Sequence, residues 1–331
     1  MEKIIFFGNG MLADYTLETL KTRGCEVIFH ARTKEDLEEA VRMKSEHPEA
    51  HGVLASYGVM IKEPVLAAFE PEGILNIHPS LLPLYRGASP IESAILAGDT
   101  TYGVSVMKLV RAMDAGPIYY QEKVDLLGMI KRLTDGADAD GLGAALNLPS
   151  GSSQPRTSEA KAEVYRILAE KGAGWLAEHL SDLPEPTPQD DAAATFTRKF
   201  EKKDGIIDPE HETAREILQK IIAFAGFPKV KYGFYGLNCI ILDAHIEKSV
   251  NGAAEAESGL KTPMVASQGH SDGGDKTHMV NLQGHSDGGD KARQLIIPCA
   301  DGASIVIDRL QPEGRKPMDA KSFINGYGKK A

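Results

Sequence analysis

The residues whose types could do chemistry are concentrated in one stretch of this sequence, 73–121. Asn76 and His78 stand two positions apart at the end of an apolar run, Ile74–Ile77, which is typical of a β-strand. Because side chains alternate along a strand, both residues should point to the same face of the sheet. Pro79 favours an extended backbone at His78, so the chain leaves the strand directly after the imidazole.

A carboxylate follows the next apolar run, which covers Val104–Met107. Asp114 comes after that run and stands just before Gly116 and Pro117, a pair typical of a turn. We expect this turn to lie at the same end of the sheet as His78, where strand–helix proteins bind their ligands. An amide, an imidazole and a carboxylate would then meet in one crevice.

These three groups suit the transfer of an acyl group by direct attack of an amine. A neutral Asn side chain can donate a hydrogen bond to the tetrahedral oxyanion without changing its charge. An imidazole can take a proton from the incoming amine and return it to the leaving nitrogen, and a paired carboxylate orients that imidazole. No Ser or Cys nucleophile is needed. The alternative is structural: Asn76 caps a turn, His78 is a buried core histidine and Asp114 begins a turn.

The segment NIHPSLLPLYRG at 76–87, followed by MDAGPI at 113–118, resembles the signature of the folate-dependent formyltransferases. Further segments are similar to the methionyl-tRNA formyltransferases, a branch of that family. They are ASYGVMIKEPVL (55–66), FTRKFEKKDGIID (196–208) and the stretch from LIIPCADG to SFINGY (295–327). The resemblance therefore reaches both halves of the chain.

The resemblance implies an enzyme that transfers a formyl group from 10-formyltetrahydrofolate to the amino group of initiator methionyl-tRNA. It implies that Asn76, His78 and Asp114 are catalytic. It also implies that the loop directly after the strand lines the tetrahydrofolate site, and the residues of this loop are Ser80, Leu81, Leu82 and Pro83. No metal is expected, because the histidines show no HExxH spacing and the cysteines form no CxxC pair.

The sequence departs from the family in the region that should contact tRNA. The tRNA enzymes carry a long Gly- and Arg-rich loop after the second strand, but here Phe29 is followed by HARTKEDLEEAVRMKSEHPEAHG. The net charge is -10 and is uneven: residues 1–190 carry 18 Lys and Arg against 28 Asp and Glu, whereas residues 191–331 carry 19 of each. A polyanion should therefore contact the second half. The candidate tRNA contacts are Arg198, Lys199, Lys202, Lys203, Arg315 and Lys316.

Other acceptors and another class of protein remain as alternatives. A sugar-nucleotide N-formyltransferase would use the same donor with an amino sugar as acceptor, but the Lys-rich RKFEKK at 198–203 fits the tRNA enzymes better. Glycinamide ribonucleotide formyltransferases usually have one domain, which the length of this chain disfavours. GNGMLA at 8–13 matches the GxGxxG/A pattern of dinucleotide-binding proteins. That pattern also needs an acid after the second strand, and residues 29–31 supply none.

Strands and helices alternate through the first 125 residues, which predicts an α/β fold with a doubly wound, mostly parallel sheet. The predicted strands are Ile4–Phe7, Val27–Phe29, Val53–Ala55, Ile74–Ile77 and Val104–Met107. The predicted helices are Tyr15–Arg23, Lys34–Lys44, Glu63–Phe69, Ala88–Ala97 and Glu159–Leu180. Such a sheet would present the three chemical groups at its carboxyl edge.

The composition also predicts how the chain divides. We expect a catalytic domain at 1–181 with an insertion at 128–158, a Pro-rich linker at 182–194 and a second domain at 195–331. Short strand-like runs with Gly turns predict that this second domain is a smaller, OB-like β-barrel. The polar stretch 249–291 contains QGHSDGGDK twice and should be a disordered insertion.

No stretch approaches the roughly 20 apolar residues of a membrane helix. The N-terminus runs at once into a strand-like segment and lacks the features of a signal peptide. We therefore expect a cytoplasmic protein with no membrane partner. We also expect a monomer.

Overall fold

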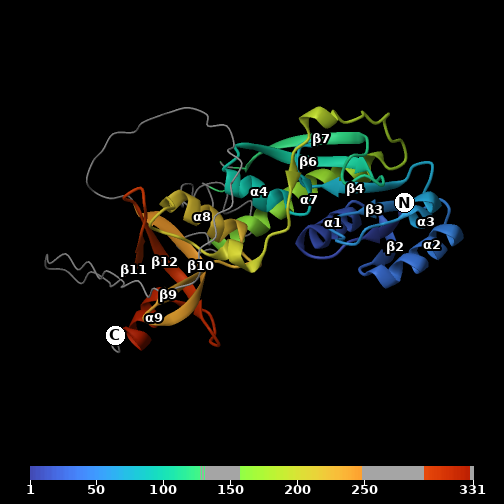
Figure 1. Ribbon diagram of the computed structural model, residues 1–331. Coiled ribbons are helices and arrows are strands. Elements are labelled where there is room, and N and C mark those ends of the chain that lie inside the picture. The colour runs from blue at the N-terminus through green and yellow to red at the C-terminus, as the bar shows by residue number, and fades with distance from the viewer. Residues whose placement is uncertain (127, 129, 131–156, 248–293, 329–331) are drawn as a thin grey trace. The chain divides into compact units, whose positions relative to one another are not determined.

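The computed structural model describes residues 1–126, 128, 130, 157–247 and 294–328, which form two compact units (Figure 1). The first unit comprises Met1–Asp204 with Gln219–Pro228, and the second comprises Gly205–Leu218 with Lys229–Ala331. The predicted insertion at 249–291 lies outside the described residues, and so does most of the insertion at 128–158.

The first unit is built on a six-stranded sheet with the order β2-β1-β3-β4-β6-β7. Its strands are β1 (Lys3–Phe7), β2 (Glu26–Ala31), β3 (His51–Leu54), β4 (Ile74–His78), β6 (Thr101–Lys108) and β7 (Ile118–Asp125). The strands from β1 to β4 pair in parallel, but β6 pairs with both β4 and β7 in the antiparallel sense. The predicted mostly parallel sheet is therefore compatible with the structure: the first four strands are parallel, whereas β6 is antiparallel to both of its neighbours. A strand's apolar pattern is the same in either direction, so the pattern could not reveal this.

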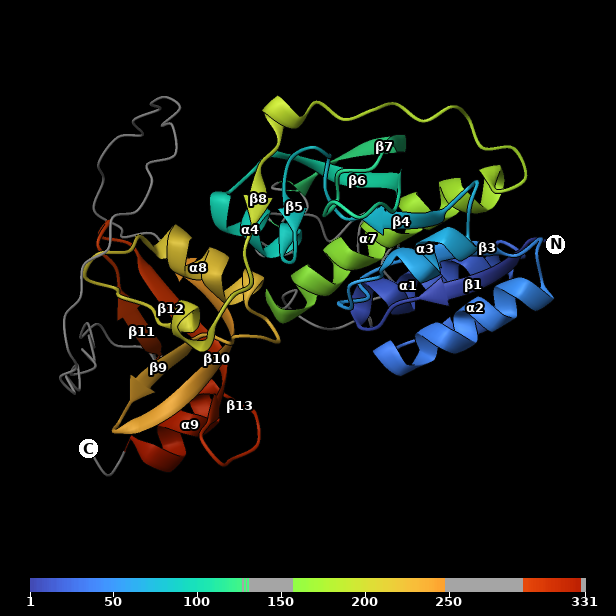
Figure 2. The same cartoon turned by 45° about the vertical axis from the view of Figure 1, so that its right-hand side comes forward.

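Helices flank this sheet on both sides (Figure 2). They are α1 (Met11–Thr22), η1 (Lys34–Asp36), α2 (Leu37–Glu46), α3 (Glu63–Ala68), α4 (Pro90–Ala97) and α7 (Thr157–His179). Helix α4 shows how local sequence sets the bounds. Pro90 occupies the first helical position, where its missing N–H is not needed, and Gly98 ends the helix with φ 69°.

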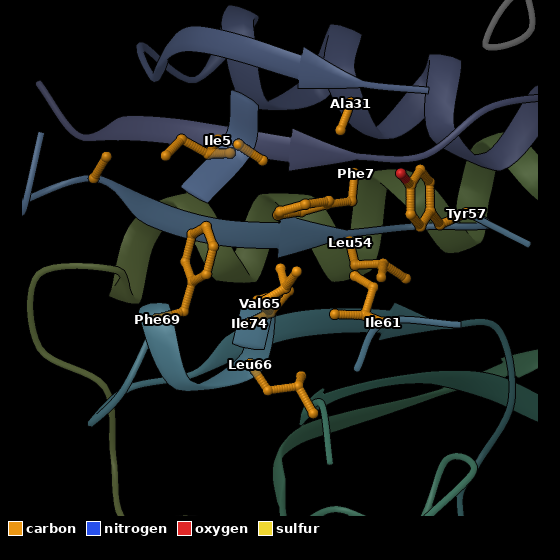
Figure 3. Packing of buried hydrophobic residues seen from close by; sticks show 12 residues of the cluster. Ile5, Phe7, Ala31, Leu54, Tyr57, Ile61, Val65, Leu66, Phe69 and Ile74 are labelled. Atoms are coloured by element: carbon orange, nitrogen blue, oxygen red, sulfur yellow. The ribbon is translucent and has the colours of Figure 1, made fainter. Parts of the chain in front are cut away.

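One face of the sheet packs against α2 and α3. Ile5 and Phe7 of β1 belong to a buried cluster on this face, together with Phe69 at the end of α3 and Ile74 of β4 (Figure 3). The ring centroid of Phe7 lies 5.6 Å from that of Phe69 and 5.8 Å from that of Tyr57, and both pairs are edge-to-face. Burying each such side chain contributes about 1.5–3 kcal/mol, so this cluster anchors the strands that lead to the site.

The opposite face packs against α7, and this contact orients β4. A Cβ atom added to Gly172 of α7 would meet the side chain of Ile77 at 2.7 Å and that of Val104 at 3.0 Å. Ile77 therefore points to α7. Because alternate residues of a strand point to opposite faces, Asn76 and His78 point away from α7. Both residues therefore lie on the same face of the sheet, as the sequence predicted.

After α7 the chain passes β7 and returns to the loop that follows β4. Thr187 and Ile118 exchange two backbone hydrogen bonds of 2.8 Å each. Further on, β8 (Phe196–Thr197) pairs in parallel with β5 (Arg86–Gly87), and the two lie side by side in Figure 2. The segment between Thr187 and β8 includes η2 (Asp191–Ala193). The predicted linker is thus bonded to β7 at Thr187, and the chain directly after the linker is bonded to β5 through β8.

The second unit contains a curled antiparallel sheet, which is compatible with the predicted β-barrel. Its strands are β9 (Lys231–Phe234), β10 (Leu237–Glu247), β11 (Leu295–Pro298), β12 (Ser304–Pro312) and β13 (Met318–Asp319). The helical segments that follow the linker are η3 (Lys202–Gly205), α8 (Ala214–Ala223) and α9 (Ala320–Tyr327). No helix among the described residues is both long and apolar enough to cross a membrane.

Candidate active site

Asn76 and His78 occupy buried positions on β4, and each is only 5% exposed. Asn76 lies between Leu54 of β3 and Met107 of β6 in the sheet register. Within the part of the chain that the structure describes, the Asn76 side-chain amide has no hydrogen-bond partner. A buried amide of this kind can still donate to a ligand, which the turn-capping alternative does not require.

The imidazole of His78 has two different neighbours. Its Nε2 atom lies 3.1 Å from the carbonyl oxygen of Tyr85, and its Nδ1 atom lies 3.8 Å from Oδ1 of Asp114. A carbonyl oxygen only accepts, so we assign the proton of the neutral ring to Nε2. The Nδ1 lone pair is then free to take a second proton, and the resulting imidazolium would lie beside a carboxylate.

Asp114 is held in a left-handed backbone conformation with φ 49°. Its Oδ2 atom accepts a 2.8 Å hydrogen bond from the backbone N–H of Gly87. The side chain of Asp114 is 14% exposed, so the carboxylate has limited access to solvent. The predicted meeting of the imidazole and the carboxylate is therefore present in the structure.

The route by which Asp114 reaches this position differs from the expectation. Strand β6 is antiparallel to β4, so Lys108 at its end lies opposite Leu75, while His78 lies opposite Ser105. The loop after β6 therefore begins at the far end of β4, where Leu109 donates to the carbonyl of Ile74 at 2.7 Å. The loop must return roughly 13 Å, four residues at about 3.3 Å each, to reach His78. The expectation that both groups leave the sheet at one end was wrong.

Two residues that the sequence reasoning did not select support this loop. Arg86 is 4% exposed, and its Nε and Nη2 atoms lie 3.0 and 2.7 Å from Oε1 of Gln189. The Nε2 atom of Gln189 in turn donates to the backbone carbonyls of Asp114 at 2.8 Å and Gly116 at 2.7 Å. Arg86 lies inside the motif quoted above, which could have marked it. Gln189 lies in the Pro-rich linker and belongs to no sequence motif, so nothing in the sequence indicated its contact with Arg86.

The loop expected to line a folate site, Ser80–Pro83, follows His78 directly and is firmly held. The hydroxyl of Ser105 donates to the carbonyl of Ser80 at 2.6 Å and accepts from the N–H of Leu82 at 3.0 Å. Gln121 donates to the carbonyl of Leu82 at 2.8 Å. The side chains of Ser80 and Leu82 are buried, whereas Leu81 and Pro83 are partly exposed. Only the latter two side chains present accessible surface.

Two tyrosines brace the same loop as neutral donors. Tyr102 donates from its hydroxyl to the carbonyl of Pro79, and burial raises its pKa well above the ordinary value. Tyr85 donates to Asp99, and burial together with this bond raises its pKa. Both phenols therefore keep their protons at neutral pH and keep the chain around His78 in place.

Within the described ranges, one group of side chains could hold a metal ion: Asp208, Glu210 and His211. All three are exposed, and groups of this kind are common on surfaces without an ion. They are not among the residues that the sequence selected for chemistry. The expectation that the enzyme needs no metal stays a prediction.

Comparison with known proteins places this chain in a family. Residues 4–133 match the formyl transferase model, and residues 199–328 match the model of the formyl transferase C-terminal domain. A methionyl-tRNA formyltransferase from Roseiflexus castenholzii is 31% identical over 275 residues, which cover 83% of this chain and 70% of that protein. The chain therefore belongs to the formyl transferase family, in its methionyl-tRNA formyltransferase group. The resemblance seen in the sequence is confirmed.

Solved structures agree with this fold. Methionyl-tRNA formyltransferase from Clostridium thermocellum aligns with a TM-score of 0.54 at 17% identity, covering 76% of this chain and 95% of that one. HypX from Aquifex aeolicus, solved with tetrahydrofolic acid, aligns with a TM-score of 0.61 at 16% identity. The whole of this chain is covered, but it spans only 48% of HypX. At these identities the likeness concerns the fold alone.

Proposed function

We propose that this chain transfers the formyl group of 10-formyltetrahydrofolate to the amino group of initiator methionyl-tRNA. Membership of the family supports the reaction class, and curated relatives that are 28–38% identical carry the name methionyl-tRNA formyltransferase. The observation that carries the proposal is the site itself. Asn76, a buried amide without a partner among the described residues, stands two positions from His78, whose Nδ1 atom faces Asp114 at 3.8 Å.

In the proposed reaction the amine nitrogen of the acceptor attacks the formyl carbon directly. A new C–N bond forms, and the electron pair of the carbonyl moves to oxygen, where the amide of Asn76 donates to the oxyanion. His78 takes a proton from the attacking nitrogen through Nδ1, and Asp114 stabilises the imidazolium. When the oxyanion collapses, the bond to N10 of the folate breaks and that nitrogen receives the proton. The products are formylated acceptor and tetrahydrofolate.

For the donor, we propose that the folate lies against the Ser80–Pro83 loop. The bonds from Ser105 and Gln121 make this loop rigid, which would preorganise a binding surface. Leu81 and Pro83 supply the partly exposed apolar side chains. Because the loop continues directly from His78, a folate held there would bring its formyl group close to the imidazole.

For the acceptor, we propose that tRNA contacts the exposed basic residues after β8 and in the second unit. Lys199 and Lys202 are exposed, and Lys203 forms an exposed ion pair with Glu201 at 3.0 Å. Arg198 pairs with Asp204 at 2.6 Å, so its charge is already partly engaged. We also propose an OB-like barrel for the second unit, on the strength of its curled antiparallel sheet. A role in translation would place the protein in the cytoplasm.

The acceptor is the part of this proposal that needs the sharpest experiment. Purified protein is given 10-formyltetrahydrofolate with either charged initiator methionyl-tRNA or a nucleotide-linked amino sugar, and the formylated product is quantified. We expect transfer to methionyl-tRNA, no transfer to uncharged tRNA, and none by the His78→Ala variant. Transfer to the amino sugar alone would overturn the tRNA assignment and establish the sugar-nucleotide alternative.

A further inference from the structure

The linker residue Gln189 joins two parts of the site that are far apart in sequence. Its Oε1 atom accepts from Nε and Nη2 of Arg86, and its Nε2 atom donates to the carbonyls of Asp114 and Gly116. The amide thus makes four hydrogen bonds, with both of its ends in use. Its partners come from the loop after β4 and from the loop after β6.

The chemistry of these partners selects glutamine. A guanidinium only donates and a backbone carbonyl only accepts, so the residue between them must accept at one end and donate at the other. Glutamate at this position would still accept from Arg86 but would place a carboxylate oxygen against two carbonyl oxygens. Alanine would leave the guanidinium of Arg86, which is 4% exposed, with the exposed Asp191 as its remaining partner among the described residues.

The same contacts hold Asp114 at two points. Its carboxylate accepts from the N–H of Gly87, and its backbone carbonyl accepts from Gln189. Asp114 has φ 49°, a left-handed conformation that is uncommon for L-residues, so its contacts with Gly87 and Gln189 help to hold it. Losing the bonds from Gln189 would let this backbone relax and would move the carboxylate away from His78.

We propose that Gln189 is a positioning residue for catalysis, which sets the place of the Asp114 carboxylate beside His78. The inference rests on the proposed function of these two residues. Gln189 contacts Arg86 and the Asp114 loop, and it acts on the reaction through that loop. The linker is therefore part of the active-site framework as well as a connection between domains.

The test compares Gln189→Glu with a matched control, Asp191→Asn. The second variant weakens only the exposed contact of the linker with Arg86, because the Asp191 side chain is 79% exposed and lies 2.7 Å from Nη2 of Arg86. The backbone bonds between Thr187 and Ile118 should keep the linker in place in both variants. We expect kcat to fall roughly tenfold in Gln189→Glu with KM for the folate donor unchanged, and to be unchanged in Asp191→Asn. An unchanged kcat in Gln189→Glu would overturn the proposal.

A double variant separates positioning from a general structural role. If Gln189 acts through Asp114, adding Gln189→Glu to Asp114→Asn should cost no further activity, because the two substitutions remove one function. A structural role elsewhere would lower kcat by the same factor in both backgrounds. That result would exclude positioning even if the single variant is impaired.

Amide exchange gives a readout that does not depend on the acceptor. The N–H of Gly87 donates to Asp114, so its hydrogen exchange should become faster in Gln189→Glu and stay as in the parent in Asp191→Asn. Unchanged protection of Gly87 would contradict the inference. If the parent fails to formylate methionyl-tRNA, the proposed function fails, but the exchange of Gly87 still decides whether Gln189 positions Asp114.

Discussion

The Nδ1 atom of His78 lies 3.8 Å from Oδ1 of Asp114. His78 is the last residue of β4, whereas the loop that carries Asp114 leaves β6 beside the opposite end of β4. One short segment orients both of them. The carbonyl of Tyr85 accepts from the imidazole, and the N–H of Gly87 donates to the carboxylate. Arg86 stands between these two residues and is itself held by the linker. The distance between base and carboxylate therefore depends on three separate parts of the chain.

The pairing of His78 with Asp114 predicts that both residues are essential for turnover. His78→Ala removes the proton acceptor, and Asp114→Asn removes the charge that stabilises the imidazolium. We expect kcat to fall at least about a hundredfold in each variant, with little change in the unfolding temperature. Single-turnover assays and thermal unfolding measure the two effects. Near-normal turnover in either variant would remove that residue from the mechanism; Glu46→Gln, on the exposed face of α2, is the control.

The buried amide of Asn76 predicts a different kinetic pattern. If it donates to the oxyanion, Asn76→Ala should lower kcat by roughly 10²–10³ and leave KM for the donor nearly unchanged. Asn76→Asp should be at least as severe, because a carboxylate in its place would repel the developing negative charge. Steady-state kinetics with varied donor decides the point. A rise in KM alone would show that Asn76 only binds substrate.

The exposed lysines after β8 predict a salt-dependent effect on tRNA binding. Reversing the charge of Lys202 and Lys203 to Glu should raise KM for tRNA, most clearly at low salt, and should leave the donor KM unchanged. Removing one contact with a phosphate should reduce the salt slope of binding by about one unit. Titrations at two salt concentrations measure this, and Lys21→Glu in α1 is the control of equal charge change for each single variant, Lys202→Glu and Lys203→Glu. Identical curves for the double variant and the parent would exclude these lysines from the tRNA interface.

Two glycines of α7 predict opposite effects of the same substitution. A methyl group at Gly172 would meet Ile77 at 2.7 Å, so Gly172→Ala should destabilise the first unit by about 1–3 kcal/mol. At Gly174 the nearest atom is in the side chain of Arg23 at 3.5 Å, so Gly174→Ala should be neutral or stabilising by up to about 1 kcal/mol. Chemical denaturation of both variants checks the prediction. Equal effects would mean that Gly172 does not set the contact between α7 and β4.

The pair of His245 and Asp308 in the second unit predicts that the stability of this unit depends on pH. Nδ1 of His245 lies 2.9 Å from Asp308, and this hydrogen bond raises the pKa of His245 above its ordinary value. A raised pKa stabilises the folded state fully below the unfolded value, about 6.5, and this contribution is lost as pH rises through the folded value. Relative to His245→Gln, the parent should therefore be more stable at about pH 5.5 than at about pH 8.5. A stability difference that is the same at both pH values would contradict this linkage, and Asp308→Asn should abolish it.

The sequence by itself determined the features that depend on neighbouring residues. The alternation of Ile74, Asn76 and His78 with apolar residues placed the amide and the imidazole on one face of β4. The predicted end of α4 at Ala97 is confirmed, because Gly98 readily adopts the left-handed conformation that ends a helix. The predicted start at Ala88 was two residues too early, since the helix begins at Pro90. The motif at 76–87 is long and specific enough to indicate the protein family. Such signals are readable because a few consecutive residues contain the whole physical cause.

Only the tertiary structure decided how the third group reaches the site. The direction of β6, the return of the Asp114 loop and the amide of Gln189 between Arg86 and that loop are relationships between distant segments. Strand β7 and helix α9 were also missed. In β7 exposed and half-buried residues alternate weakly, so its neighbour β6 determines its structure more than its own pattern. Spacing along the chain does not record these contacts, since they form only when packing brings separate elements together.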